Sequence, residues 1–479
     1  MNSPKVIILG GGIAGIASAV ILSERGIDTT IIEKEDYLGG RAGAFPITLK
    51  TGETVEMERG FHAFFRQYYN LRSLLSRISP DLSILKPLDD YPIVGYDNSF
   101  QSFSKLPKRA PWNLIALTRR NTELTWKALR KIKLRPAISM LAYHQSQTYK
   151  RYDNESATSY LNSLNFPPKA RQMLFDVFSH SFFNPEESMS AAELLMMFHF
   201  YFMGNREGLI FDVIKSPFSN GLWKPMRNYL EKKSVKIFTG ESANSINHVP
   251  EGWEINTSSK GKLSANAVVV ALNVPGLKNL IANSILNHAP WNKEINRLEV
   301  TLPFVVWRLW LDCPIIANPQ IFAGTAGFPY LDNISLIHLF QDESKNWADI
   351  HKGSVVELHA YAVPTSTKEA TIKEAMINGL HKIYPETKTA NILDEVYMLR
   401  QDCPAFNLNT YNNRPTVITP HSNLYLAGDF VRLDQPSALM ERATIAGMTA
   451  ANFILKKWGY DQENILSVGQ HGIFPSIAA

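Results

Sequence analysis

The chain has 479 residues, 45% of them hydrophobic, which is enough for two domains with a substantial core. The net charge of +5 does not by itself indicate a partner. The two cysteines, Cys313 and Cys403, lack metal-ligand spacing, which argues against a disulfide framework or metal site and favours the reducing cytoplasm. No apolar run is long enough to span a bilayer, which argues against an integral membrane protein.

The first predicted unit is a strand, a glycine turn and a helix. Apolar residues 6–9 precede Gly10, and helical spacing runs from Ile13 to Arg25. Gly10 permits the turn, Gly12 lets a ligand approach the backbone, and Gly15 allows close packing of helix and strand. The helix N-terminus would present free N–H groups to phosphates. Such a turn also occurs for packing alone, but its setting here predicts a dinucleotide site.

A second strand, Thr29–Glu33, ends in a carboxylate at the distance expected for an acceptor of the adenosine ribose hydroxyls. These features alone do not separate NAD from FAD. Two further stretches bear on that choice, Gly39-Gly40-Arg41 and Asn423–Asp429. Together they resemble the flavoprotein family of amine oxidases, protoporphyrinogen oxidases and carotenoid desaturases. The resemblance implies FAD as cofactor, with Arg41 over its pyrophosphate and the Gly428-Asp429 pair at its ribityl and phosphate region.

The resemblance extends to the segment that starts at Glu56. In the wider family an acid-x-Gly-x-His segment passes along the isoalloxazine edge, and Gly60–Arg72 resembles the β-carotene desaturase/methyltransferases, or isorenieratene synthases. Glu58 departs from the aspartate expected before Arg-Gly. His62 is the candidate catalytic residue, either assisting proton removal or donating a hydrogen bond near the cofactor. The residues expected to contact FAD are Gly10, Gly12, Ala14, Gly15, Glu33, Gly40, Arg41, Gly60, Phe61, Ala243, Gly428, Asp429 and Met440.

The pattern predicts an α/β fold, with an FAD-binding Rossmann-like domain of the glutathione-reductase type and an interleaved α+β substrate domain. The FAD-binding domain is expected over residues 1–75, 220–285 and 410–460. The substrate domain is expected over 76–219 and 286–409, and residues 461–479 form a C-terminal tail. Segments 304–311 and 354–361 are predicted strands of a sheet that faces the flavin.

Two helices are predicted next to the expected site. Ser190 and Glu193 form a candidate capping box for a helix that is apolar almost all round, which fits either core packing or the wall of a cavity. The last helix is predicted to start at Pro436 and Ser437 and to reach about Lys457. The resemblance implies that its N-terminus points at the flavin N1/C2 carbonyl. Glu441 in its first turn is interpreted as a structural carboxylate.

The basic residues are concentrated in one segment. Lys105–Arg135 holds ten lysines and arginines against one acid, which leaves a net charge of −4 for the rest of the chain. Apolar residues, including two tryptophans, are interleaved with the cations, a combination that suits an anionic membrane better than a nucleic-acid groove. The alternative is a solvated helical face. The expected location is cytoplasmic and peripheral, at the inner face of a membrane, and no pattern indicates the oligomeric state.

The resemblance implies oxidation of an apolar carotenoid-like substrate, in which the β-ionone ring loses hydride to FAD, a methyl group migrates and the ring becomes aromatic. Aromatic faces could stabilise positive charge on the ring, with Phe198, Tyr201 and Trp307 as candidates and core packing as their alternative role. Two other classes stay open. One is an amine or porphyrinogen oxidase of the same fold, and the other is a carotenoid or lipid carrier that keeps FAD without catalysis.

Overall fold

The computed structural model describes residues 4–88, 90–104, 106–107, 112, 116, 132–172, 183–286 and 288–473. Most of the basic segment Lys105–Arg135 therefore lies outside the described residues, and its predicted membrane contact stays a prediction. Within the described ranges, no helix combines the length and apolar character needed to cross a bilayer. The same ranges contain no cluster of side chains suited to a metal ion.

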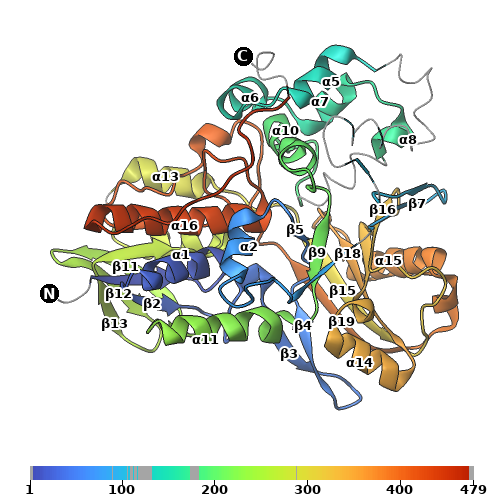
Figure 1. The fold of residues 1–479 in the computed structure, drawn as a ribbon, viewed down its shortest axis with the longest axis horizontal. Helices are drawn as coiled ribbons and strands as arrows, with labels where there is room; N and C mark the ends of the chain where they lie inside the picture. Colours follow the sequence, from blue (N-terminus) through green and yellow to red (C-terminus); the bar gives the residue numbers. More distant parts are fainter. Residues whose placement is uncertain are drawn as a thin grey trace.

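A parallel sheet forms the centre of one half of the molecule, drawn on the left of Figure 1. Strand β1 (Lys5–Leu9) is apolar and buried from Val6 onward, as expected of a strand covered on both faces. In the described chain the strand order is β10-β2-β1-β14-β20. Strand β1 pairs with β2 (Asp28–Ile32) and β14 (Ala267–Val270). Outside them, β10 (Lys236–Phe238) pairs with β2 and β20 (Leu424–Leu426) pairs with β14, so the sheet gathers strands from distant parts of the chain.

Two helices pack closely beside this sheet, α1 (Ile13–Glu24) and α16 (Leu439–Trp458). A side chain at Gly447 could not fit, because its Cβ would lie 2.1 Å from the carbonyl oxygen of Ala14. The Ser18 hydroxyl donates a hydrogen bond to the Gly447 carbonyl at 2.8 Å. The glycine thus lets the first and last helices of the fold touch backbone to backbone. The other elements of this half are α2 (Tyr69–Leu75), α11 (Lys224–Lys232), β11 (Ala243–Val249), β12 (Gly252–Thr257), β13 (Lys262–Ala265), α12 (Val274–Ala282) and α13 (Ala289–Arg297).

The second half is built on a mixed sheet with the order β19-β15-β18-β17-β16-β7-β8 in the described chain. Its central strands, β15 (Phe304–Leu311) and β18 (Ser354–Ala360), pair antiparallel and are buried along their whole length. Helices α14 (Asp342–His351) and α15 (Glu369–Ile383) lie beside this sheet in Figure 1. The remaining strands are β7 (Ile93–Gly95), β8 (Phe100–Gln101), β16 (Phe322–Ala326), β17 (Asn333–Leu336) and β19 (Ile392–Arg400).

Short strands connect the two halves, and a group of helices lies above them in Figure 1. The connecting strands are β3 (Ala44–Thr48), β4 (Thr54–Glu58), β5 (Phe64–Phe65), β6 (Leu85–Pro87) and β9 (Phe211–Ile214). The described helices of the upper group are α5 (Leu134–Leu141), α6 (Gln145–Tyr152), α7 (Ala157–Ser163), α8 (Pro168–Arg171) and α10 (Ala191–Phe198). Helix α10 continues into a π-helical turn, His199–Met203, and a second π-helical turn, Ser219–Trp223, precedes α11.

The capping box predicted at the start of α10 is half correct. The Ser190 side chain accepts a hydrogen bond from the N–H of Ala192, so it caps the helix as expected. The Ser190 N–H donates instead to the carbonyl of Phe406. Glu193 turns away from the cap to form ion pairs with Arg442 at 2.5 Å and Arg414 at 3.5 Å. Burial beside two arginines therefore outweighs the local capping interaction.

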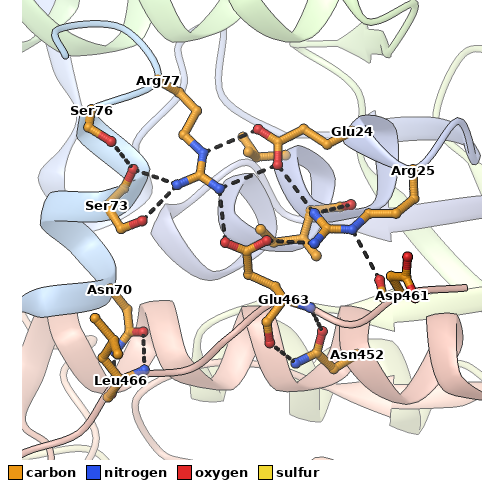
Figure 2. A network of polar contacts seen from close by, with 12 residues as sticks. Glu24, Arg25, Asn70, Ser73, Ser76, Arg77, Asn452, Asp461, Glu463 and Leu466 are labelled. Carbon is orange, nitrogen blue, oxygen red and sulfur yellow. Dashed lines mark hydrogen bonds and ion pairs between the residues drawn. The ribbon is translucent and has the colours of Figure 1, made fainter.

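The segment after α16 lies against α1, α2 and the upper helices. Glu463 forms ion pairs with Arg25 at 2.6 Å and Arg77 at 2.9 Å, and its backbone bonds to Asn452 (Figure 2). Leu466 exchanges backbone hydrogen bonds with the Asn70 side chain. Further on, the Gly469 carbonyl meets the His199 ring at 2.6 Å, and Gly472 donates to Tyr143. This tail joins α1 and α2 to the upper helices.

Candidate cofactor and active site

Among the glycines of the turn, only Gly12 has open space beside it that a ligand could occupy. Gly10 has a φ of +105°, and a Cβ there would lie 2.5 Å from the carbonyl oxygen of Ala271. A Cβ at Gly15 would lie 1.9 Å from the Gly10 carbonyl oxygen. At Gly12, by contrast, the nearest atom would be the Gly40 Cα at 3.8 Å. Gly12 precedes α1 without any side-chain cap, so the first N–H groups of that helix are open to a phosphate.

Glu33 lies just past the end of β2 and is only 6% exposed. Its carboxylate accepts hydrogen bonds from the N–H groups of Gly11 at 2.6 Å and Glu35 at 2.9 Å. Burial raises the pKa of Glu33, and the two N–H donors oppose that rise. A carboxylate oriented in this way retains lone pairs for hydroxyl donors such as those of a ribose. The strand that begins at Ala243 is close by, since the Glu241 N–H donates to the Glu33 carbonyl at 2.9 Å.

Arg41 and Asp429 form an ion pair at 2.5 Å across 388 residues of sequence. Burial disfavours the charge of Arg41, but the Asp429 carboxylate outweighs it and raises the pKa of the guanidinium. Both neighbouring glycines, Gly40 and Gly428, have positive φ angles, +58° and +149°. Two residues predicted from opposite ends of the chain thus lie together beside the glycine turn, because Gly12 and Gly39 form a β-bridge.

Helix α16 begins at Leu439, two residues later than the sequence predicted, with Ala438 as its N-cap. Ser437 does not cap the helix, because its hydroxyl donates to the Gln435 carbonyl. Met440 therefore lies in an uncapped first turn whose N–H groups and positive dipole end suit a group that carries negative charge.

Glu441 is a structural carboxylate, as interpreted from the sequence. It accepts hydrogen bonds from the backbone N–H groups of Asn70 and Leu71, both at 2.9 Å, and from the Asn70 amide at 2.6 Å. It therefore caps the N-terminus of α2 from a different helix. Burial raises the pKa of Glu441 to about 7, against the effect of these donors.

The segment Gly60–His62 packs against the mixed sheet. Gly60 has a φ of +114°, and a Cβ there would lie 3.1 Å from both the His359 ring and the Val306 side chain. The Phe61 ring lies 4.8 Å from that of Phe322. His62 donates from Nδ1 to the Gly60 carbonyl at 2.7 Å, and burial lowers its pKa to about 4, so the ring is neutral at pH 7. In this contact His62 acts as a hydrogen-bond donor, while proton removal by His62 stays a prediction.

A buried ionic cluster lies directly behind Gly60. Arg308 of β15 is 1% exposed and contacts Glu58 at 3.0 Å and Glu357 at 2.7 Å. Glu58 also accepts hydrogen bonds from the Gln341 amide at 2.7 Å and the Phe218 N–H at 3.1 Å. Burial disfavours the charge of Glu357, but Arg308 outweighs it and lowers the pKa of Glu357 to about 2. Glu58, which the sequence analysis noted only as a departure from the family's aspartate, is thus one member of a buried cluster in which opposite charges are paired.

Glu357 begins a chain of side-chain contacts that the sequence interpretation missed. His359 Nε2 lies 2.8 Å from Glu357 Oε1, and its Nδ1 lies 3.0 Å from the Tyr361 hydroxyl. The amide of Asn333 donates to the same hydroxyl oxygen at 2.9 Å. The spacing Glu-x-His-x-Tyr could have revealed this arrangement, because alternate residues of a strand face the same side.

Trp307 points away from the Gly60 segment. It belongs to the apolar cluster that includes Ile372 and Met376 of α15, whereas its neighbour Val306 packs with Met57. Its indole N–H donates to Glu395 at 2.6 Å. Tyr201 is buried, and its hydroxyl lies 2.8 Å from that of Tyr68. The surroundings of Trp307 and Tyr201 agree with core packing, which the sequence analysis gave as their alternative role.

The fold and the glycine-built cradle are those of a flavoprotein. The sequence profile of the flavin-containing amine oxidoreductases matches residues 13–455, and the chain belongs to this family. It is an FAD-dependent oxidoreductase, and the predicted α/β fold and cofactor are confirmed. The open space at Gly12, the Glu33 carboxylate and the Arg41–Asp429 pair fit a dinucleotide with a pyrophosphate and a ribose.

Several relatives match almost the whole chain, among them two carotenoid phi-ring synthases. A carotenoid phi-ring synthase of Streptomyces griseus is 41% identical, over 98% of this chain and 91% of the relative. A carotenoid phi-ring synthase of Chlorobaculum tepidum is 27% identical over the same shares. Among solved structures, a putrescine oxidase bound to putrescine has a TM-score of 0.71 at 13% identity, covering 95% of this chain and 99% of its own. A putative protoporphyrinogen oxidase from Exiguobacterium sp. has a TM-score of 0.64 at 16% identity, covering 95% and 100%. These two structures show the fold.

Proposed function

We propose that this oxidoreductase desaturates the β-ionone ring of a carotenoid and shifts one methyl group, so that the ring becomes aromatic, as in isorenieratene. The observation that carries the proposal is the 41% identity to a carotenoid phi-ring synthase over 98% of the chain. The family resemblance of Gly60–Arg72 points to the same reaction. The substrate would be an apolar carotenoid, and FAD the acceptor of hydride.

In this reaction each ring loses two hydrides and two protons, and a methyl group moves from C1 to C2. When bound, FAD would supply the redox chemistry, and the loss of two hydrides from each ring would require an external two-electron acceptor between two rounds. The chain itself must bind an apolar ring, exclude water and accept protons. Aromatic side chains next to Gly60 support the first two roles, since Phe61, Phe211 and Phe322 lie within 5.9 Å of one another between ring centroids.

We propose the cofactor contacts and domains given by the sequence analysis. The cradle of Gly12, Glu33, Arg41 and Asp429 supports the contacts at the adenosine and pyrophosphate end. The uncapped first turn of α16 would face the flavin and stabilise its reduced, anionic form. All strands of the parallel sheet come from the ranges 1–75, 220–285 and 410–460, which supports the proposed division.

We further propose that segment 105–135 docks the enzyme on an anionic membrane, from which a carotenoid would enter. The excess of nine positive charges and the interleaved tryptophans support this role. The test is sedimentation with phosphatidylcholine vesicles that contain or lack phosphatidylglycerol. Binding that needs the anionic lipid and weakens when Arg119, Arg120, Lys127 and Arg130 become glutamine supports docking. Equal sedimentation of this variant and the wild type contradicts it.

The ring reaction is tested by expression in bacteria that accumulate β-carotene. Pigments lighter by four hydrogens per modified ring, with aromatic methyl signals by NMR, are expected. A Gly12→Val variant, whose side chain would fill the space at the turn, is the negative control. An unchanged pigment pool in cells that contain folded, FAD-loaded wild type would contradict the proposed substrate. Amines would then be assayed next.

A further inference from the structure

We propose that Tyr361 accepts a proton from the substrate ring and passes its own hydroxyl hydrogen to His359, with Glu357 as the positioning residue behind it. This inference rests on the proposed function, which requires two protons to leave each ring. It assigns the proton transfer to side chains on β18 and immediately after it, not to His62.

The hydrogen-bond pattern is compatible with this direction of transfer. Because the Asn333 amide donates to the Tyr361 oxygen, the tyrosine hydrogen is free to donate to His359 Nδ1 at 3.0 Å. The opposite nitrogen, Nε2, lies 2.8 Å from Glu357 and 3.5 Å from the Phe61 N–H, and the shorter contact with the carboxylate favours a hydrogen on Nε2. His359 is 2% exposed and Glu357 is fully buried, so solvent does not compete for these contacts. The tautomer needed to accept a hydrogen from tyrosine is therefore the one that Glu357 stabilises.

Tyr361 lies where the relay can reach a substrate. With Ala362 it lines a cavity of about 740 Å³, whose other walls include the apolar Leu161 and Phe166 and the charged Arg171 and Glu186. A cavity of this size accommodates a cyclohexene ring with its methyl groups. Tyr361 also packs against the apolar cluster that includes Met57 and Cys403.

The surrounding charges support proton acceptance by this histidine. Arg308 holds Glu357 through Nε at 2.9 Å and Nη2 at 2.7 Å, which keeps the carboxylate ionised and oriented. An imidazolium formed at His359 would then be paired with an existing anion. Other buried acids near the cradle are already engaged, Glu441 by three N–H donors and Asp212 by Arg66 and Arg72.

The step balances without a further reactant. A ring C–H bond breaks, and its electron pair stays in the ring as a new C=C bond after hydride loss. The proton bonds to the Tyr361 oxygen while the original hydroxyl hydrogen moves to His359 Nδ1. The resulting imidazolium returns its proton to solvent through Tyr361 and the cavity, which restores the starting state.

The test compares purified, FAD-loaded wild type with Tyr361→Phe and the matched control Tyr384→Phe, which removes a buried hydroxyl elsewhere in the same half. With β-carotene and an external two-electron acceptor, we expect Tyr361→Phe to form aromatic product about 100-fold more slowly, while flavin bleaching by the first hydride, followed in anaerobic mixing without the acceptor, stays within about threefold of wild type. The control should leave both rates unchanged. Retained FAD content and melting temperature exclude a folding defect.

Glu357→Gln tests the relay from its other end. Arg308 keeps the amide oxygen on its own side, so the amide nitrogen would donate to His359 Nε2 and reverse the tautomer, with a loss of about 100-fold or more in aromatic product. Wild-type rates of aromatic product in either Tyr361→Phe or Glu357→Gln would overturn the relay. Absence of aromatic product from wild type would instead contradict the proposed function, so the two failures are distinguishable.

Discussion

The cofactor cradle and the buried ionic face of β18 handle charge in different ways. At its glycine turn the cradle uses backbone N–H groups and missing side chains, since a Cβ at Gly15 would collide with Gly10 and one at Gly12 would enter open space. The β18 face uses charged side chains that compensate one another, with Arg308 between Glu58 and Glu357. Ligand binding at the glycine turn therefore depends on the shape of the backbone. The stability of the ionic cluster at β18 depends on every charged partner being present.

The largest loss of stability is expected from a substitution of Arg308, the cation that lies between the two buried carboxylates. Arg308→Met leaves two buried carboxylates without a cation and should lower the free energy of unfolding by about 3–5 kcal/mol. Denaturant unfolding measures the change. Adding Glu58→Gln and Glu357→Gln to the same chain should recover most of the loss, because no uncompensated charge remains. A single variant as stable as wild type would show that the cluster is hydrated.

Glu441, a buried carboxylate near the cradle, is expected to make the stability of the protein depend on pH. Its pKa is raised by burial to about 7, so it contributes stability that is complete below its unfolded pKa and is lost as pH rises through 7. Wild type should therefore lose about 2–3 kcal/mol between pH 5 and pH 8 from this group. Glu441→Gln should flatten that part of the profile. An unchanged slope in the variant would contradict the assignment.

Substitutions in the glycine turn can separate the effect on FAD binding from the effect on the free energy of unfolding. Gly15→Ala should destabilise the protein by about 1–3 kcal/mol and abolish FAD binding, because the methyl group collides with the Gly10 carbonyl. Gly12→Ala should keep the unfolding free energy of the FAD-free protein within about 0.5 kcal/mol of wild type, since its φ of −76° suits alanine, yet still lose FAD. Flavin absorbance and denaturant unfolding measure the pair. Full FAD content in Gly12→Ala would place the pyrophosphate elsewhere.

The smallest effect is expected in the partly exposed network of the tail. Arg77→Ala removes ion pairs to Glu24 and Glu463, all with side chains 17–19% exposed, and should cost no more than about 1 kcal/mol. The highly exposed Lys34 is the control, and Lys34→Ala should have no measurable effect. Thermal unfolding at low and high salt measures both. A loss of several kcal/mol in Arg77→Ala would mean that the tail is part of the core.

The sequence predicted the cradle because its signals are contiguous. Glycines, an apolar strand and the acid at Glu33 lie within a few dozen residues and have fixed local meanings. It also predicted the strands 304–311 and 354–361 that became β15 and β18. The start of α16 was missed by two residues because Pro436 and Ser437, typical of helix starts, lie in an extended segment before Leu439.

The ionic cluster could not be predicted in the same way. Arg308 faces Glu357 because β15 and β18 pair antiparallel in that register, and no local pattern specifies register between strands 40 residues apart. Glu58 joins them from a third strand. The alternation of Glu357, His359 and Tyr361 was visible, but only the pairing with Arg308 and Asn333 shows that these polar side chains face the interior. Trp307 looked equally suited to the site, and strand alternation directs it to the opposite face.

The contact of α1 with α16 has a consequence for biosynthesis. Gly447 packs on Ala14, and Asp429 pairs with Arg41, so the glycine turn is synthesised long before the residues that complete its surroundings. At roughly 5–20 residues per second, a ribosome makes the intervening 388 residues in about 20–80 s. During that time the glycine turn exists without Asp429 or the start of α16. Completion of the cradle is therefore expected only after Asp429 and the start of α16 have been synthesised, whereas β1 can pair with β2 and β14 earlier.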